Sequence, residues 1–209
     1  MSKKIYSEIQ QRILSGTYES GEIIKEKELA EEFNVSRTPV RESLARLEWE
    51  KLVTIIPRAG AMVAPSEVNL IKEAYQVRLV LEGYMGRLAA ARITEKQIDE
   101  LEALKSECEA LIDQGNQDDL NAISVKVRKV LGKAAGNKTL VELSDRLFNI
   151  TVRVWHSIPE NEAHSELAEA LNTEIETIVT AFRKKDADAA EQAMQNAILY
   201  YIEKLKRVF

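Results

Sequence analysis

The sequence predicts a mainly α-helical protein in two parts: a helix-turn-helix unit with a small β-hairpin, followed by an antiparallel helical bundle. Apolar residues recur at spacings of three and four along most of the chain, which is the period of one face of a helix. Three of the four prolines, Pro39, Pro57 and Pro65, lie in the first third of the chain. Prolines interrupt helices, so their position indicates that a compact, turn-rich unit comes first.

Composition excludes several classes of protein. The chain has 209 residues, of which 45% are hydrophobic and 30% charged, so it can bury a real core. One cysteine, Cys108, rules out a disulfide framework, and with only His156 and His164 the chain cannot assemble a zinc cluster of Cys and His. No segment is apolar enough to span a membrane or to form a signal-peptide core, so we expect a cytoplasmic protein without membrane contact.

Charge divides the chain near Pro65. Residues 1–65 carry ten basic and ten acidic side chains, whereas residues 66–209 carry 19 basic and 24 acidic ones, so the net charge of -5 comes from the second part. Proline disfavours a helix in the residue before it, and Ser66 is a suitable N-cap for a helix that follows. We therefore predict one domain over residues 1–65 and another over residues 66–209.

A helix-turn-helix spacing follows a first helix over residues 4–15. Residues 25–33 and 36–47 predict two helices separated by Asn34-Val35, because Asn tolerates the left-handed conformation that a tight turn needs. Ser36 is a suitable N-cap for the second helix, and Pro39 falls in its first turn, where a missing N–H breaks no hydrogen bond.

Two features of this unit suit a nucleic acid. Arg37 and Arg41 share the outer side of the second helix near its N-terminus, the part of a recognition helix that meets base edges in a major groove. Residues 52–56 and 61–63 predict two strands joined by a turn whose tip carries Arg58. A merely solvated helix face is the alternative explanation of the two arginines, but it leaves their coincidence with the N-cap, the proline and the hairpin unexplained.

The second part predicts helices only. The pattern from Thr94 to Gln97 predicts a capping box that opens one helix, Gly115-Asn116 supplies the stop of that helix, and Gly136-Asn137 ends another. Periodic apolar residues place the six helices over residues 67–88, 94–111, 116–136, 137–154, 167–182 and 190–208. Such a series packs as an antiparallel bundle.

These residues resemble a known family. The first part is similar to the winged helix-turn-helix of the GntR transcription regulators, in residues 13–16, in residues 29–44 and in the wing glycine, Gly60. The second part is similar to the all-helical FCD effector domain of the FadR-like branch, in residues 78–82, 89–91 and 134–137. One departure is Lys51, where the family usually has Gly; its side chain would cap helix carbonyls or contact a phosphate.

The resemblance implies that the protein is not an enzyme but a DNA-binding transcription regulator, and more specifically a repressor. It would bind a palindromic double-stranded operator as a homodimer through residues 1–65, and a small effector in the helical domain would modulate that binding. The alternative is a constitutive DNA-binding dimer whose helical domain is only a dimerisation scaffold. The residues expected at DNA are Lys27, Ser36, Arg37, Thr38, Arg41, Arg46, Arg58 and Gly60.

Many FCD domains hold a divalent metal through one Asp and three His. The resemblance places these positions at Ser124, Arg128, Ile175 and Ala197, and none of these is a good metal ligand. We therefore expect no metal and no other cofactor.

The effector prediction rests on Arg78, Ser124 and Arg128. Two guanidinium groups in one cavity would bind a small anion, such as a carboxylate, through paired hydrogen bonds. Two alternatives stay open at this point. Arg128 could belong to a solvated basic face, and Arg78 could simply pair with Glu82 four residues later.

Overall fold

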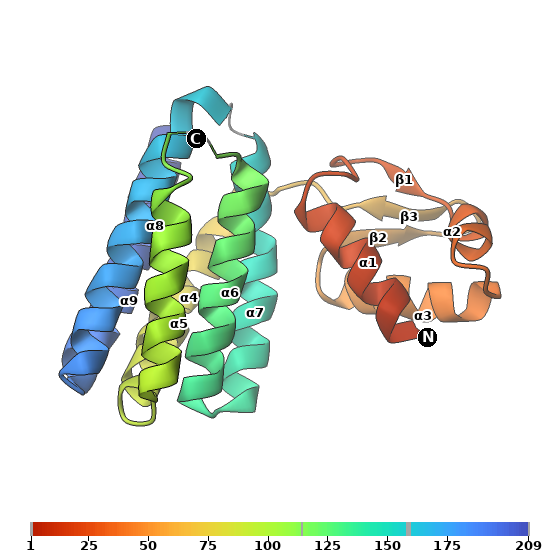
Figure 1. Ribbon diagram of the computed structural model, residues 1–209. Coiled ribbons are helices and arrows are strands. Elements are labelled where there is room, and N and C mark those ends of the chain that lie inside the picture. Colours follow the sequence, from red (N-terminus) through yellow and green to blue (C-terminus); the bar gives the residue numbers. More distant parts are fainter. Residues whose placement is uncertain (1, 114, 158–159, 209) are drawn as a thin grey trace. The chain divides into compact units, whose positions relative to one another are not determined.

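A computed structural model describes residues 2–113, 115–157 and 160–208 (Figure 1). These residues form two compact units. The first contains the chain up to Ile71 together with Asn149–His156, and the second contains Lys72–Phe148 together with the chain from Ser157 onward. Because these units are defined by packing alone, the domain boundary after Pro65 stays a prediction.

The first unit combines three helices with a small antiparallel sheet. The helices are α1 (Ser2–Leu14), α2 (Glu26–Glu32) and α3 (Arg37–Trp49), and the strands are β1 (Ile23–Ile24), β2 (Val53–Ile56) and β3 (Gly60–Val63). Strand β3 lies in the centre, with Val53 opposite Val63 in β2 and Ile23 opposite Met62 in β1. The predicted helices and hairpin are confirmed, whereas β1 was not predicted, because two residues are too few to show strand alternation.

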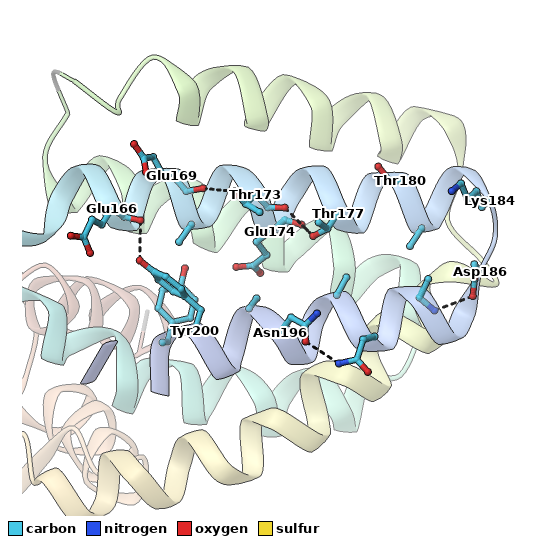
Figure 2. A pocket seen from close by; sticks show the side chains of 17 residues that line it. Glu166, Glu169, Thr173, Glu174, Thr177, Thr180, Lys184, Asp186, Asn196 and Tyr200 are labelled. Carbon is cyan, nitrogen blue, oxygen red and sulfur yellow. Dashed lines mark hydrogen bonds between the residues drawn. The ribbon is translucent and has the colours of Figure 1, made fainter. Parts of the chain in front are cut away.

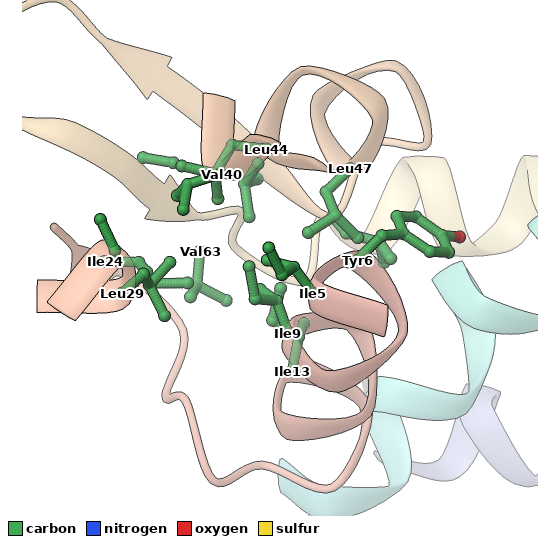
Figure 3. Packing of buried hydrophobic residues seen from close by; sticks show 14 residues of the cluster. Ile5, Tyr6, Ile9, Ile13, Ile24, Leu29, Val40, Leu44, Leu47 and Val63 are labelled. Carbon is green, nitrogen blue, oxygen red and sulfur yellow. The ribbon is translucent and has the colours of Figure 1, made fainter. Parts of the chain in front are cut away.

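Helices α1 and α3 pack their apolar stripes against each other and the sheet (Figure 3). Ile9 of α1 and Val40 and Leu47 of α3 are fully buried, as expected for residues spaced at helical intervals. The core is completed mainly by Ile5, Ile13, Ile24, Leu29, Leu44, Leu52 and Val63. Burial of such side chains removes apolar surface from water, at about 25 cal/mol per Å², and this fixes the position of α3.

Left-handed residues end α2 and α3. Asn34 has φ of 51°, as predicted for the turn between the two helices. Lys51 has φ of 64°, which explains why a glycine is usual at this position in the resembled family. The backbone N–H of Lys51 donates to the carbonyl of Glu48 at 2.9 Å, so part of the capping at this helix end comes from the main chain.

The helical bundle uses the predicted caps. Its elements are α4 (Val68–Ala90), α5 (Glu95–Glu109), α6 (Gln117–Ala135), α7 (Lys138–Val152), the 3-10 helix η1 (Arg153–Ser157), α8 (Glu160–Arg183) and α9 (Ala187–Val208). Thr94 and Gln97 form the capping box of α5, and Gly136 ends α6 with φ of 63°. Within the second unit, α5 packs on α6 and α8, and α8 packs on α9.

Some predicted helix bounds differ from the structure. The helix predicted over residues 94–111 ends at Glu109 and a turn follows, and the helix predicted over residues 167–182 begins earlier, at Glu160. Asn116 then serves as the N-cap of α6, where its side-chain oxygen accepts from the backbone N–H of Asp119 at 3.0 Å.

None of the helices in the described ranges is long and apolar enough to cross a membrane.

Gly60 tests the packing of the sheet. Its φ is +131°, and a Cβ atom there would lie 2.2 Å from the carbonyl oxygen of Ile24 in β1. We predict that Gly60→Ala lowers the free energy of unfolding by about 2 kcal/mol or more, because backbone strain adds to this collision. Urea denaturation followed by circular dichroism measures the loss.

Gly21→Ala is the matched control. Gly21 also has positive φ, +85°, but nothing lies within 4 Å of its Cβ position. The control isolates the conformational cost, so equal losses in the two variants would contradict the packing argument for Gly60.

Candidate DNA interface and buried ion cluster

The N-terminal half of α3 is exposed and basic. Ser36 is its N-cap, but the serine side chain makes no capping hydrogen bond. Arg37 and Thr38 follow in the first turn, and both are exposed. Within the described residues Arg37 has no ion-pair partner. A free guanidinium next to the positive end of a helix dipole suits a phosphate or a base edge.

Arg41 is held by an acidic residue that the sequence did not point to. Its Nε donates to a carboxylate oxygen of Glu26 in α2 at 2.7 Å, while 64% of the Arg41 side chain stays exposed. This bond places the start of α2 beside α3. Lys27, the next residue in α2, is exposed and lies 3.7 Å from the carboxylate of Glu31. The structure therefore brings Lys27 and Arg41 into one neighbourhood.

Arg46 lies on another side of α3. It follows Arg37 by nine residues, which corresponds to a rotation of about 180° in an α-helix. Its guanidinium stacks on the ring of Tyr6, 3.8 Å from the centroid, and donates to Glu50 at 3.2 Å. The Tyr6 hydroxyl donates to the same carboxylate at 2.6 Å. Arg46 thus joins α1 to the end of α3, and its expected DNA contact stays untested.

The wing residues differ in exposure. Arg58, in the turn between β2 and β3, is exposed and has φ of 68°. Gly60 is buried against β1, so the structure gives it a packing role. Any contact of Gly60 with DNA remains a prediction about the backbone of the wing.

In the helical bundle, three helices meet at one buried carboxylate. Glu82 of α4 is 1% exposed, and it accepts from Arg78 Nε at 3.1 Å and from Arg128 of α6 at 2.6 Å. Ser144 of α7 accepts from Arg128 at 2.8 Å and donates to Glu82 at 3.0 Å. The ring of Phe148 lies beside both guanidinium groups. We call Arg78, Glu82, Arg128 and Ser144 the buried ion cluster.

Electrostatics explain why this cluster stays charged. Burial raises the pKa of Glu82, but the charges of Arg128 and Arg78 outweigh burial and bring the pKa below its ordinary value. Burial lowers the pKa of Arg128, but the negative charges of Glu82 and Asp145 outweigh burial and raise that pKa above its ordinary value. Arg78 and Arg128, two of the three predicted effector residues, therefore already pair with Glu82.

The expected metal positions do not fit a metal. Ser124 lies one turn before Arg128 on α6, Ile175 is fully buried, and Ala197 has no donor atom. Arg128 brings a positive charge, which repels a cation. Across residues 2–113, 115–157 and 160–208, no group of three His, Cys, Asp or Glu side chains is placed to hold a metal ion.

Comparison with known proteins assigns the family. The GntR family of bacterial regulatory proteins matches residues 1–63, and the FCD domain matches residues 73–199. The chain belongs to the GntR family. It is a GntR regulator with an FCD domain, as the resemblance predicted.

Two curated relatives and one solved structure are similar to this chain over most of its length. The Uxu operon regulator of Haemophilus influenzae is 30% identical over 89% of this chain and 74% of its own length. The repressor RspR of Escherichia coli is 26% identical over 100% of this chain and 90% of its own length. Escherichia coli McbR/YncC has a TM-score of 0.84 at 18% identity, over 99% of this chain and 97% of that chain, which shows a shared fold. The two curated relatives are named as an operon regulator and a transcriptional repressor.

Glu82 is the residue on which the cluster depends. We predict that Glu82→Gln lowers the free energy of unfolding of this GntR regulator by about 3 to 5 kcal/mol, because it removes the buried negative charge that Arg78 and Arg128 share. Asp145→Asn is the control, since Asp145 also pairs with Arg128, at 3.1 Å, but its side chain is 53% exposed. The control should cost less than about 1 kcal/mol in urea denaturation. Equal losses would contradict a central role for Glu82.

Proposed function

We propose that this GntR regulator is a homodimeric repressor that binds a palindromic operator with the N-terminal half of α3 and with the wing. The observation that carries this proposal is the exposure of four cationic side chains on α2, α3 and the turn between β2 and β3: Lys27, Arg37, Arg41 and Arg58. We name these four residues the basic surface. Relatives named as repressors, such as RspR of Escherichia coli, support repression rather than activation.

The residues of the basic surface have different roles. Arg37 and Arg41 read base edges in the major groove, with Ser36 and Thr38 contacting the backbone beside them. Lys27 and Arg58 contact phosphates. Glu26 holds Arg41 in the free protein, so Arg41 exchanges a carboxylate for a base when it binds DNA.

Two substitutions separate base reading from phosphate contact. We predict that Arg41→Ala weakens operator binding by about 1 to 3 kcal/mol and relaxes the preference at one base pair of each half-site. Lys27→Ala should weaken binding to all sequences alike and reduce the salt slope by about one unit. Fluorescence anisotropy with operator variants at several salt concentrations measures both effects. Unchanged affinity and base preference in Arg41→Ala would show that α3 is not the recognition helix.

The homodimer needs an interface, and we propose helix α4. Val77, Val80 and Tyr84 lie on one side of α4 and are 49%, 65% and 48% exposed. Large apolar side chains at this spacing form a continuous stripe, which is typical of a surface that another protein covers. A dimer also places two α3 helices on two half-sites, and a single short helix contacts too few bases to select an operator.

A charge on this stripe tests the interface. We predict that Val80→Glu raises the dissociation constant of the dimer, because the new carboxylate must be buried when two copies associate. Val125→Glu on α6 is the control, since Val125 is 38% exposed but lies outside the stripe. Sedimentation equilibrium measures the constant. A monomeric wild-type protein, or the same effect in both variants, would contradict the proposal.

We also propose that a small anionic effector binds beside the buried ion cluster. Two guanidinium groups there face one buried carboxylate, and Nε of Arg128 has no hydrogen-bond partner among the described residues. Ser124 adds a hydroxyl one turn away. Thermal shifts across a panel of organic acids test this site, since a ligand that binds only the folded state stabilises it. Arg128→Ala should then bind operator but no longer respond to the acid.

One observation favours the alternative, a constitutive DNA-binding dimer with a helical scaffold. Glu82 already pairs with both Arg78 and Arg128, so the cluster is stable without an effector. If no compound in the panel shifts the melting temperature or changes operator affinity, the scaffold function is the correct one.

A further inference from the structure

A groove runs along the helix pair α8 and α9 (Figure 2), and no member of the buried ion cluster lines it. Its volume is about 710 Å³, within the range of small-molecule sites, about 300 to 1,000 Å³. Small side chains leave this room: Ala170 and Ala181 on α8, and Ala189, Ala193 and Ala197 on α9. Room alone does not identify a ligand, but the polar groups of the lining do.

The charges along the groove are mostly negative. Glu166, Glu169, Glu174 and Asp186 line it, against a single lysine, Lys184. Glu166 is already paired with Lys204, and Asp186 accepts from the backbone N–H of Ala189 at 2.9 Å. Within residues 2–113, 115–157 and 160–208, no cation forms an ion pair with the carboxylate of Glu169 or Glu174.

Glu174 lies in the middle of this groove. Figure 2 shows its side chain pointing from α8 into the space between the two helices. No side chain in the described ranges donates a hydrogen bond to its carboxylate. Burial and the nearby charge of Glu82 raise the pKa of Glu174 to about 7, although Arg78 and Arg128 partly lower it. These arginines already serve Glu82, so Glu174 has no partner of its own.

The neutral groups also offer acceptors. The hydroxyl groups of Thr173, Thr177 and Thr180 donate their protons to carbonyl oxygens of α8 itself, at 2.9, 2.9 and 2.8 Å. Each hydroxyl oxygen therefore has only lone pairs left for a ligand. A ligand that supplies several N–H donors matches this lining, and one that supplies a carboxylate does not.

We propose that the groove between α8 and α9 binds an organic amine, with its ammonium group at Glu174 and its apolar body over the alanine side chains. The carboxylates that line the groove favour a cationic ligand over an anionic one. No residue of the buried ion cluster lines the groove, although the charges of Arg78, Arg128 and Glu82 act on Glu174. The helical domain would then bind two ligands of opposite charge: an anion beside the buried ion cluster and an amine in the groove.

Titration calorimetry with the full chain at about pH 8, where Glu174 is ionised, tests the amine site. The probes are 2-phenylethylamine and 2-phenylethanol, which share an apolar body and differ in charge. The amine should bind more tightly than the alcohol. Glu174→Gln should weaken amine binding about tenfold or more, because a charged hydrogen bond is lost. Glu142→Gln, an equal charge change on the exposed surface of α7, should bind like the wild type.

Three results would overturn the amine site: no binding of the amine, equal affinity for amine and alcohol, or unchanged amine affinity in Glu174→Gln. The Gln variant keeps the shape of the side chain, and its melting temperature shows whether it is folded. Operator binding is measured without either compound, so a failure of the amine site leaves the DNA-binding proposal separately testable.

Discussion

The helical unit depends on one buried carboxylate. Glu82 accepts from Arg78 in its own helix, from Arg128 in α6 and from Ser144 in α7, so three helices are fixed at one point. A carboxylate this deep is costly unless opposite charges and hydrogen bonds surround it. Each member of the cluster therefore constrains the others, and the positions of α4, α6 and α7 follow from that mutual dependence.

The buried ion cluster includes Arg128, one of the four positions where the resemblance to FCD domains places metal ligands. An ion bound by side chains from several helices joins those helices, and the Glu82 cluster makes the same kind of connection with guanidinium groups. Once Arg128 lies there, a divalent cation is repelled.

The sequence predicted the features that local physics determines. Apolar spacing located the helices, and the capping residues Thr94, Asn137 and Gly136 located several of their ends. The DNA surface on α3 could be predicted because Arg37 and Arg41 lie on a single helix, where spacing fixes which residues share a side.

Features that join distant segments could not be predicted. The pair of Arg78 and Glu82 could be anticipated as a helical ion pair, but nothing local shows that Arg128, 46 residues later, binds the same carboxylate. The bond between Glu26 and Arg41 likewise depends on how α2 packs on α3. Gly60 resembled a wing glycine, and its packing reason emerged only with β1, a strand too short to recognise.

The most direct test of this account of the buried ion cluster is the metal content of the purified protein, measured together with its melting temperature before and after chelation. The account predicts no stoichiometric zinc, manganese or nickel, and a melting temperature that a chelator leaves unchanged, because the charges of Arg78 and Arg128 are already balanced by Glu82 and Asp145. One metal ion per chain, lost on chelation together with a fall in melting temperature, would contradict it.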